Sequence, residues 1–201
     1  MVDIIHAAGW PIWPLIFASI IAVAIIFERL WALRTSIIAP EGLLLEARKM
    51  ITKDGVKKEA IQSLQDHSML GEIFASALNN FNSPSEIIKD AIEETGRAIN
   101  HKLEKYLSTL GTIATVAPLL GLFGTIIGMV ELFSSFTSSG NDVAVFARGI
   151  SIALYNTAGG IVVAVPAMIA YRFFRTKIDT IIVEMEQQAI KLVEIINGNR
   201  K

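Results

Sequence analysis

The sequence contains no cysteine and only three histidines, His6, His67 and His101. The absence of cysteine excludes a disulfide framework, a thiolate metal site and a cysteine nucleophile. The histidines are too widely separated to indicate a histidine-based metal site, so no metal or other cofactor is expected. We find no nucleophile–base pair and no phosphate-binding loop, and we therefore predict that the chain is not an enzyme.

Charge is also scarce. Only 18% of the residues are charged, the formal net charge is −1, and 52% of the residues are hydrophobic. The mean hydropathy of +0.51 is high for a soluble domain. A chain with so little net charge has no overall field to attract nucleic acid, so a nucleic-acid partner is not expected.

Three stretches, 7–27, 107–130 and 149–171, contain no Asp, Glu, Lys, Arg or His. Each is long enough to cross a lipid bilayer as a helix. Trp10, Trp13 and Trp31 flank the first stretch, as is typical of residues at a membrane interface. The alternative for this stretch is a buried core helix. No basic residues precede it as they would in a secretory signal, so we expect it to be retained.

We therefore predict an all-α integral membrane protein with three transmembrane helices and long cytoplasmic helical extensions. The expected segments are an N-terminal segment with the first transmembrane helix (1–34), a cytoplasmic helical loop (35–106), the second transmembrane helix (107–136), a periplasmic hairpin (137–147), the third transmembrane helix (148–171) and a cytoplasmic C-terminal helix (172–201). An apolar stripe without a strong breaker predicts one continuous helix from Pro84 through the second span.

The orientation follows from the distribution of basic residues. One side of the membrane carries Arg29, Arg34, Lys105, Arg172, Arg175 and Lys177. The other side carries Asp3, Asp142 and, close to the edge of a span, only Arg148. The positive-inside rule then predicts a periplasmic N-terminus and a cytoplasmic C-terminus.

Small and hydroxylated residues recur every three or four positions on the second and third spans. In the second span they are Gly111, Ala114, Pro118, Gly121, Thr125 and Gly128; in the third they are Ala153, Thr157, Gly160, Ala164 and Ala167. Small faces let membrane helices approach closely, so we expect both faces to point toward other helices or a lumen. Asn156 lies beside the second of these faces, and lipid is a costly environment for its amide.

Several of these residues have a structural alternative. The hydroxyls of Thr125 and Thr157 could simply bond to carbonyls of their own helices. Pro118 and Pro166 are expected to shape the helices and could be simple kinks.

Glu131 and Arg148 lie near the outer ends of their spans and are candidates for an outer gate. Glu131 could equally lie at the lipid headgroups.

Two runs on these spans, APLLGLFGTIIG at 117–128 and GISIALYNTAGGIVVAVPA at 149–167, resemble the signature of the MotA/TolQ/ExbB proton-channel family. With three spans rather than four, the chain is more similar to ExbB and TolQ than to MotA, and ExbB is the first choice. One difference stands out. Ile152 occupies a position where ExbB and TolQ usually carry Glu, so a relay through that carboxylate cannot operate here.

The resemblance implies a homo-oligomeric ring, typically a pentamer, in the bacterial inner membrane, with a lumen lined by the second and third spans. The residues implied to line this lumen or the proton pathway are Gly121, Thr125, Gly128, Ala153, Asn156, Thr157 and Gly160. Partners would be a one-span protein resembling ExbD or TolR with an essential Asp, and a TonB- or TolA-like protein.

The implied function is an ExbB-like subunit that converts proton-motive force into work for TonB-dependent outer-membrane transport. A TolQ-like role in the Tol-Pal system and a non-conducting membrane scaffold are the alternatives. Neither lumen span offers a titratable group near its middle, as a proton relay across a bilayer requires. Alone, the chain would form half of a proton pathway.

Overall fold

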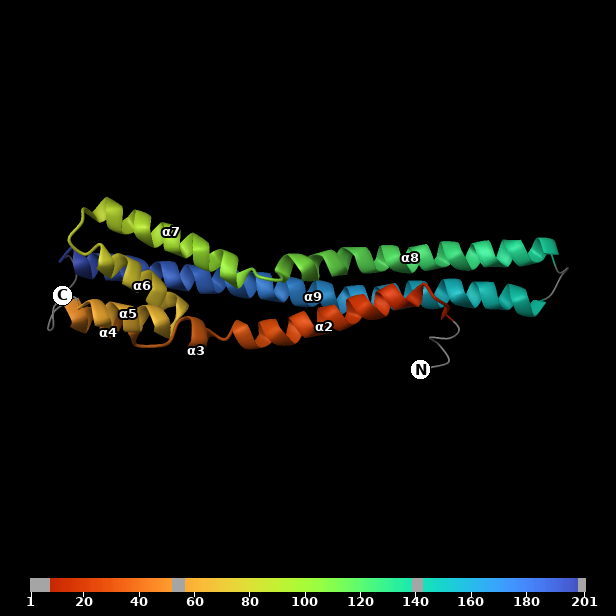
Figure 1. The fold of residues 1–201 in the computed structure, drawn as a ribbon, viewed down its shortest axis with the longest axis horizontal. Coiled ribbons are helices and arrows are strands. Elements are labelled where there is room, and N and C mark those ends of the chain that lie inside the picture. The colour runs from red at the N-terminus through yellow and green to blue at the C-terminus, as the bar shows by residue number, and fades with distance from the viewer. Residues whose placement is uncertain (1–7, 52–56, 139–142, 199–201) are drawn as a thin grey trace. The chain divides into compact units, whose positions relative to one another are not determined.

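The computed structural model describes residues 8–51, 57–138 and 143–198. Over these residues the chain is helical and contains no strand (Figure 1). The helices are α2 (Ile12–Ala32), α3 (Thr35–Ile38), α4 (Leu43–Lys49), α5 (Lys58–His67), α6 (Met69–Asn79), α7 (Ser85–Leu103), α8 (Leu107–Ser138) and α9 (Val143–Ile196).

Three of the described helices contain segments long and apolar enough to cross a membrane: Ile12–Ala32, Leu107–Ser134 and Phe146–Ile196. Large apolar side chains are exposed along them. On α2 these include Phe17, Ile20, Val23 and Phe27. Such faces are expected where lipid or another protein chain covers them. The prediction of an all-α chain with three membrane-spanning helices is confirmed.

The chain forms two compact units. The first, here called the span unit, comprises Met1–Glu28 and Tyr106–Phe173. The second, the extension unit, comprises Arg29–Lys105 and Phe174–Lys201. Both α2 and α9 contribute residues to each unit, and each unit is described on its own below.

Helix α6 forms the centre of the extension unit. Seven of its residues are buried: Leu70, Gly71, Ile73, Phe74, Ala75, Ala77 and Leu78. It packs against α5 and α7. The last part of α9 adds a buried stripe at helical spacing, Phe174, Ile178, Ile181, Met185, Ala189 and Leu192. The apolar periodicity of the sequence thus builds a small helical core.

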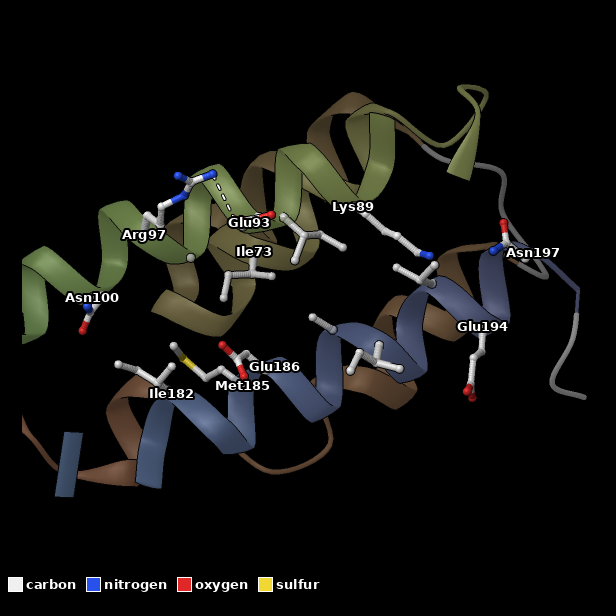
Figure 2. Close-up of a pocket in the computed structure, with 15 residues that line it drawn as sticks. Ile73, Lys89, Glu93, Arg97, Asn100, Ile182, Met185, Glu186, Glu194 and Asn197 are labelled. Atoms are coloured by element: carbon white, nitrogen blue, oxygen red, sulfur yellow. Dashed lines mark ion pairs between the residues drawn. The ribbon is translucent and has the colours of Figure 1, made fainter. Parts of the chain in front are cut away.

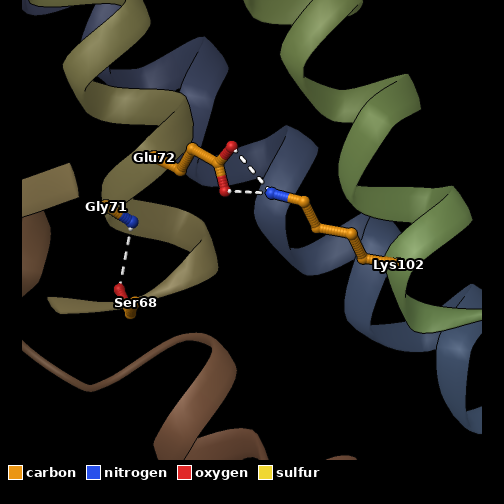
Figure 3. Close-up of polar contacts among 4 residues, drawn as sticks. All are labelled: Ser68, Gly71, Glu72 and Lys102. Atoms are coloured by element: carbon orange, nitrogen blue, oxygen red, sulfur yellow. Dashed lines mark hydrogen bonds and ion pairs between the residues drawn. The ribbon is translucent and has the colours of Figure 1, made fainter. Parts of the chain in front are cut away.

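Polar contacts fix the start of α6 and its junction with α7 (Figure 3). The Ser68 hydroxyl accepts a hydrogen bond of 3.0 Å from the backbone N–H of Gly71, which caps the helix. From α7, Lys102 reaches both carboxylate oxygens of Glu72 at 2.9 Å. This ion pair is partly exposed, so it orients the two helices more than it stabilises them.

Arg29 is a buried charge at the end of α7. Only 4% of its surface is exposed, and its guanidinium donates a 3.0 Å hydrogen bond to the carbonyl of Leu103. The last carbonyls of a helix have no partner within the helix, and a cationic donor is a favourable partner for them. The contact therefore compensates part of the cost of burying this charge and also closes α7.

The prediction of one continuous helix from Pro84 through the second span is wrong. Helix α7 ends at Leu103 and α8 begins at Leu107. Between them Tyr106 has a φ of 64°, a left-handed conformation that is uncommon for a residue other than glycine. Because no proline or glycine marks this break, the residue pattern does not indicate it.

The third span and the C-terminal segment belong to one helix of 54 residues, α9. The expected boundary at 171/172 falls inside this helix, so the membrane boundaries of the segments stay predictions. Within the expected hairpin, 137–147, residues 139–142 lie outside the described part of the chain.

Two glycines of the extension unit, Gly71 and Gly96, give a matched stability test. A Cβ at Gly71 would collide with the carbonyl of Leu64, whereas a Cβ at Gly96 would meet nothing within 4 Å. We expect Gly71→Ala to lower the free energy of unfolding by about 1–3 kcal/mol because the backbone must move. Gly96→Ala should raise it by up to about 1 kcal/mol through helix propensity. Thermal unfolding of the purified protein in detergent measures both. Equal effects of the two substitutions would contradict the packing described for α6.

Candidate functional site

The span unit is built on a close contact between α8 and α9. A Cβ at Gly121 would lie 2.8 Å from the carbonyl oxygen of Asn156 and 3.2 Å from the Cα of Gly160. A Cβ at Gly160 would lie 2.7 Å from the carbonyl oxygen of Ala117. Real Cβ atoms do not approach backbone atoms this closely, so the two backbones are in direct contact at these glycines.

The same contact continues along both helices. A Cβ at Gly128 would lie 2.9 Å from both the backbone nitrogen of Ala153 and the carbonyl oxygen of Gly149. A Cβ at Gly149 would lie 2.7 Å from the Cβ of Leu132. The small residues therefore follow the line where α8 and α9 touch, which is the close approach that such residues permit in membrane proteins.

This arrangement bears on the residues expected to line a lumen. Four of them lie on the contact between two helices of one chain: Gly121, Gly128, Ala153 and Gly160. Their exposure to a lumen stays a prediction. The contact gives them a role that the sequence had left open, because small faces can point to other helices or to a lumen.

Thr125 and Thr157 are both partly exposed, and each hydroxyl bonds to its own helix. The Thr125 hydroxyl donates to the carbonyl of Leu122 at 2.6 Å, and the Thr157 hydroxyl donates to the carbonyl of Ala153 at 3.3 Å. A threonine hydroxyl has one hydrogen to donate and two lone pairs to accept with. Within this chain both threonines therefore make the back-bond considered as the alternative, and each oxygen keeps its capacity to accept.

Asn156 is completely buried between the helices. Its side-chain nitrogen donates two hydrogen bonds of 2.8 Å, one to the carbonyl of Ile152 in the preceding turn and one to the carbonyl of Ala8. Its side-chain oxygen is also buried and has no hydrogen-bond partner among the described residues. The contact with Ala8 could not be anticipated, because a backbone carbonyl leaves no signal in the sequence.

Pro118 and Pro166 lie inside α8 and α9, which continue past them. Each removes one backbone N–H, so the carbonyls of Ala114 and Val162 lose their usual helical donor. Both prolines are exposed on the surface of the chain.

Glu131 and Arg148 are exposed, near the ends of α8 and α9 that lead to the connector 139–142. Their role as an outer gate stays a prediction.

The extension unit contains a groove of about 760 Å³ between α7 and the last part of α9 (Figure 2). Its lining is mainly apolar and includes Ile73, Ile92, Met185, Ala189 and Val193. Charged side chains also line it, with Lys89, Glu93 and Arg97 on α7 and Glu186 and Glu194 on α9; Arg97 and Glu93 form an exposed ion pair of 3.1 Å. The described residues contain no group of three His, Asp or Glu that could hold a metal.

The family model described as the MotA/TolQ/ExbB proton channel family matches residues 65–187, which include both contacting spans. The chain belongs to this family. It is 32% identical over 176 residues to a putative biopolymer transport protein, ExbB-like 3, from Synechocystis sp., covering 85% of this chain and 82% of that protein.

Other members show similar relationships. The biopolymer transport protein exbB1 of Vibrio cholerae is 28% identical, covering 80% of this chain and 72% of that protein. The Tol-Pal system protein TolQ of Pseudomonas aeruginosa is 28% identical, covering 84% and 78%. In fold, the chain is similar to a chain of the flagellar MotAB stator complex from Bacillus subtilis, with a TM-score of 0.58, 19% identity and coverage of 94% of this chain and 78% of that one.

Two adjacent glycines test the contact between α8 and α9. Gly160 faces the backbone of α8, whereas a Cβ at Gly159 would meet only the Leu15 side chain, at 3.7 Å. We expect Gly160→Ala to lower the free energy of unfolding by about 1–3 kcal/mol, because the two backbones must separate. Gly159→Ala should be neutral or slightly stabilising. Thermal unfolding in detergent provides the measurement, and an equally harmful Gly159→Ala would argue against the contact.

Proposed function

We propose that this chain is the channel subunit of an inner-membrane motor that converts proton-motive force into mechanical work on a periplasm-spanning partner. The family match across both contacting spans is the observation that carries this proposal. We assign the chain an ExbB-like role. A TolQ-like role is the second candidate, since a TolQ is among the relatives that match most of the chain.

In this proposal several copies, five in the typical family arrangement, form a ring around a lumen. The exposed apolar side chains support it. On α8 they include Leu119, Leu122, Ile126, Val130 and Phe133, and on α9 Leu154, Ile161, Val162, Val165 and Ile169. Apolar surface of this extent requires cover by lipid or by neighbouring copies.

A one-span partner resembling ExbD or TolR would occupy the lumen and supply the titratable Asp. The spans of this chain have no Asp, Glu, Lys, Arg or His in 107–130 and 149–171. A proton relay needs a titratable group at depth, so a second protein must provide it. A TonB- or TolA-like protein would receive the resulting motion.

We propose that the N-terminus and the hairpin are periplasmic and that the loop 35–106 and the C-terminal part of α9 are cytoplasmic. The excess of Lys and Arg next to the spans on that side supports this orientation. The proposed segments keep the boundaries predicted from the sequence.

Thr125 and Thr157 would serve the partner's Asp in this scheme. An ionised carboxylate in a low-dielectric lumen needs donors, because burial without them is strongly disfavoured. Each threonine can turn its hydroxyl from its helix carbonyl to the carboxylate, and it can accept from the protonated acid. A ring of identical copies would repeat these hydroxyls around the axis as equivalent positions for the Asp.

The purified chain alone should conduct few protons. The polar side chains of 107–130 and 149–171 are serines, threonines, two tyrosines and Asn156, so a charge entering the lumen would meet a large desolvation barrier. Proton flux into liposomes, measured with a pH-sensitive dye, tests this with and without the Asp-bearing partner. Rapid flux through the chain alone would overturn the half-pathway model, and absence of flux with the partner would favour a scaffold.

The threonine hydroxyls can be tested by isosteric substitution. Thr125→Val and Thr157→Val should each reduce partner-dependent flux about tenfold or more, since loss of a donor to a charged group costs on the order of 1–3 kcal/mol. Thr→Ser at either position should keep most of the flux. Thr115 is a matched control, since it makes the same kind of helix back-bond but lies off the predicted lumen face. If both Val variants assemble and show normal flux, the two hydroxyls do not serve the partner's Asp and the threonines contribute only to packing.

A further inference from the structure

The short segment before α2 is held by both of the other spans. The carbonyl of Ala8 accepts a 2.8 Å hydrogen bond from Asn156 on α9. Two residues later, the ring of Trp10 lies edge-on to the ring of Phe123 on α8, with centroids 6.2 Å apart and planes at 76°. Between them Gly9 has a φ of 72°, which turns the chain sharply. All of these residues belong to the span unit.

Gly124 makes room for the Asn156 side chain. A Cβ at Gly124 would collide with the Cβ of Asn156 and would lie 2.6 Å from its Cγ. Gly124 directly follows Phe123, which contacts Trp10. The polar and aromatic contacts therefore lie on the same turn of α8, and together they form a clasp made of Ala8, Trp10, Phe123, Gly124 and Asn156.

The clasp lies within the apolar stretch of α9, toward the end of the span that is away from Arg172. Asn156 precedes Arg172 by 16 residues on one continuous helix, which corresponds to roughly 24 Å. Residues 9–11 are not helical, and backbone of this kind is tolerated at membrane depth only where protein covers it and satisfies its polar groups. Ala8 is completely buried, so its carbonyl depends on the amide donor.

We propose that Asn156 is a positioning residue that fastens the segment before α2 to α9. Successive residues on a helix point about 100° apart. By holding its own side chain against Ala8, Asn156 therefore fixes the direction in which Thr157 points. The attachment of the segment rests on the contacts above. The role of this attachment in orienting Thr157 toward a lumen rests on the proposed function.

The attachment is measured directly through Ala8→Cys, which is a unique label because the chain contains no cysteine. The full-length Ala8→Cys protein in nanodiscs is treated with a membrane-impermeant maleimide. Adding Asn156→Ala should increase the labelling rate roughly tenfold, as expected when a buried carbonyl loses its donor. Ser151→Ala is the matched control, because its hydroxyl bonds only to the carbonyl of Ala147 on the same helix, and it should leave the rate unchanged. An unchanged rate in Asn156→Ala would overturn the proposal.

A second pair of variants separates hydrogen bonding from packing. Gly124→Ala should also accelerate labelling, because its methyl group displaces the amide. Combining it with Asn156→Gly restores the space but not the donor, so the double variant should regain thermal stability while its labelling stays fast. Slow labelling in that double variant would show that packing alone holds the segment, against the proposal.

Asn156→Asp should make the labelling rate depend on pH, which a role in packing alone would not do. A protonated carboxyl can donate to Ala8, whereas an ionised one cannot. The structure places Ala8, Ile152, Gly121 and Gly124 against Asn156, and none of these carries a titratable side chain. The labelling rate, divided by that of the Asn156 protein at the same pH, should rise between about pH 5 and pH 9. A flat ratio would count against Asn156 as the donor. The labelling assay does not depend on proton flux. If the Ala8→Cys protein is labelled slowly whenever Asn156 is present but conducts no protons with its partner, the proposed function is wrong and the attachment still holds.

Discussion

The close approach of α8 to α9 is the constraint on which the span unit depends. At Gly121, Gly128 and Gly160 no side-chain carbon fits between the two backbones. In a membrane the hydrophobic effect does not drive helices together, so such contacts must come from van der Waals packing and hydrogen bonds. The glycines supply the packing. At Gly124 the missing side chain also leaves room for the buried amide of Asn156.

The apolar runs were sufficient to predict three spans, since length and lack of charge are nearly decisive for a membrane helix. The break at Tyr106 could not be predicted, because a left-handed tyrosine depends on tertiary contacts rather than on local preference. For the site, the 3–4 spacing singled out Gly121, Gly128 and Gly160, which lie on the contact between α8 and α9, but it could not say what each face meets. The spacing of Gly121 or Ala153 is the same whether a neighbouring helix or a lumen lies opposite.

For Asn156, too, the sequence did not show which groups the side chain contacts. Its amide amid apolar neighbours predicted a protein contact, and the structure identifies the acceptors as the backbone carbonyls of Ala8 and Ile152. Ile152 is the position at which the resemblance to ExbB and TolQ implied a Glu, and its backbone carbonyl accepts a hydrogen bond from the neutral amide of Asn156 one turn later. The chain thus has an uncharged, hydrogen-bonded site at this level of α9. One of the two hydrogen bonds of the Asn156 amide joins α9 to the segment before α2.

In the proposed ring, the contacts that join the helices would also have a mechanical role. A partner that turns inside a lumen exerts force on the lining helices, and helices joined only by weak apolar contacts would rotate or slide in response. Backbone contact at the glycines resists sliding, because the two surfaces interlock without intervening flexible side chains. The directional bond from Asn156 to Ala8 resists rotation of α9, because its geometry tolerates only a narrow range of angles. In the proposed ring, Thr125 and Thr157, whose hydroxyls bond to carbonyls of their own helices, would be the groups that change partners while the frame holds still.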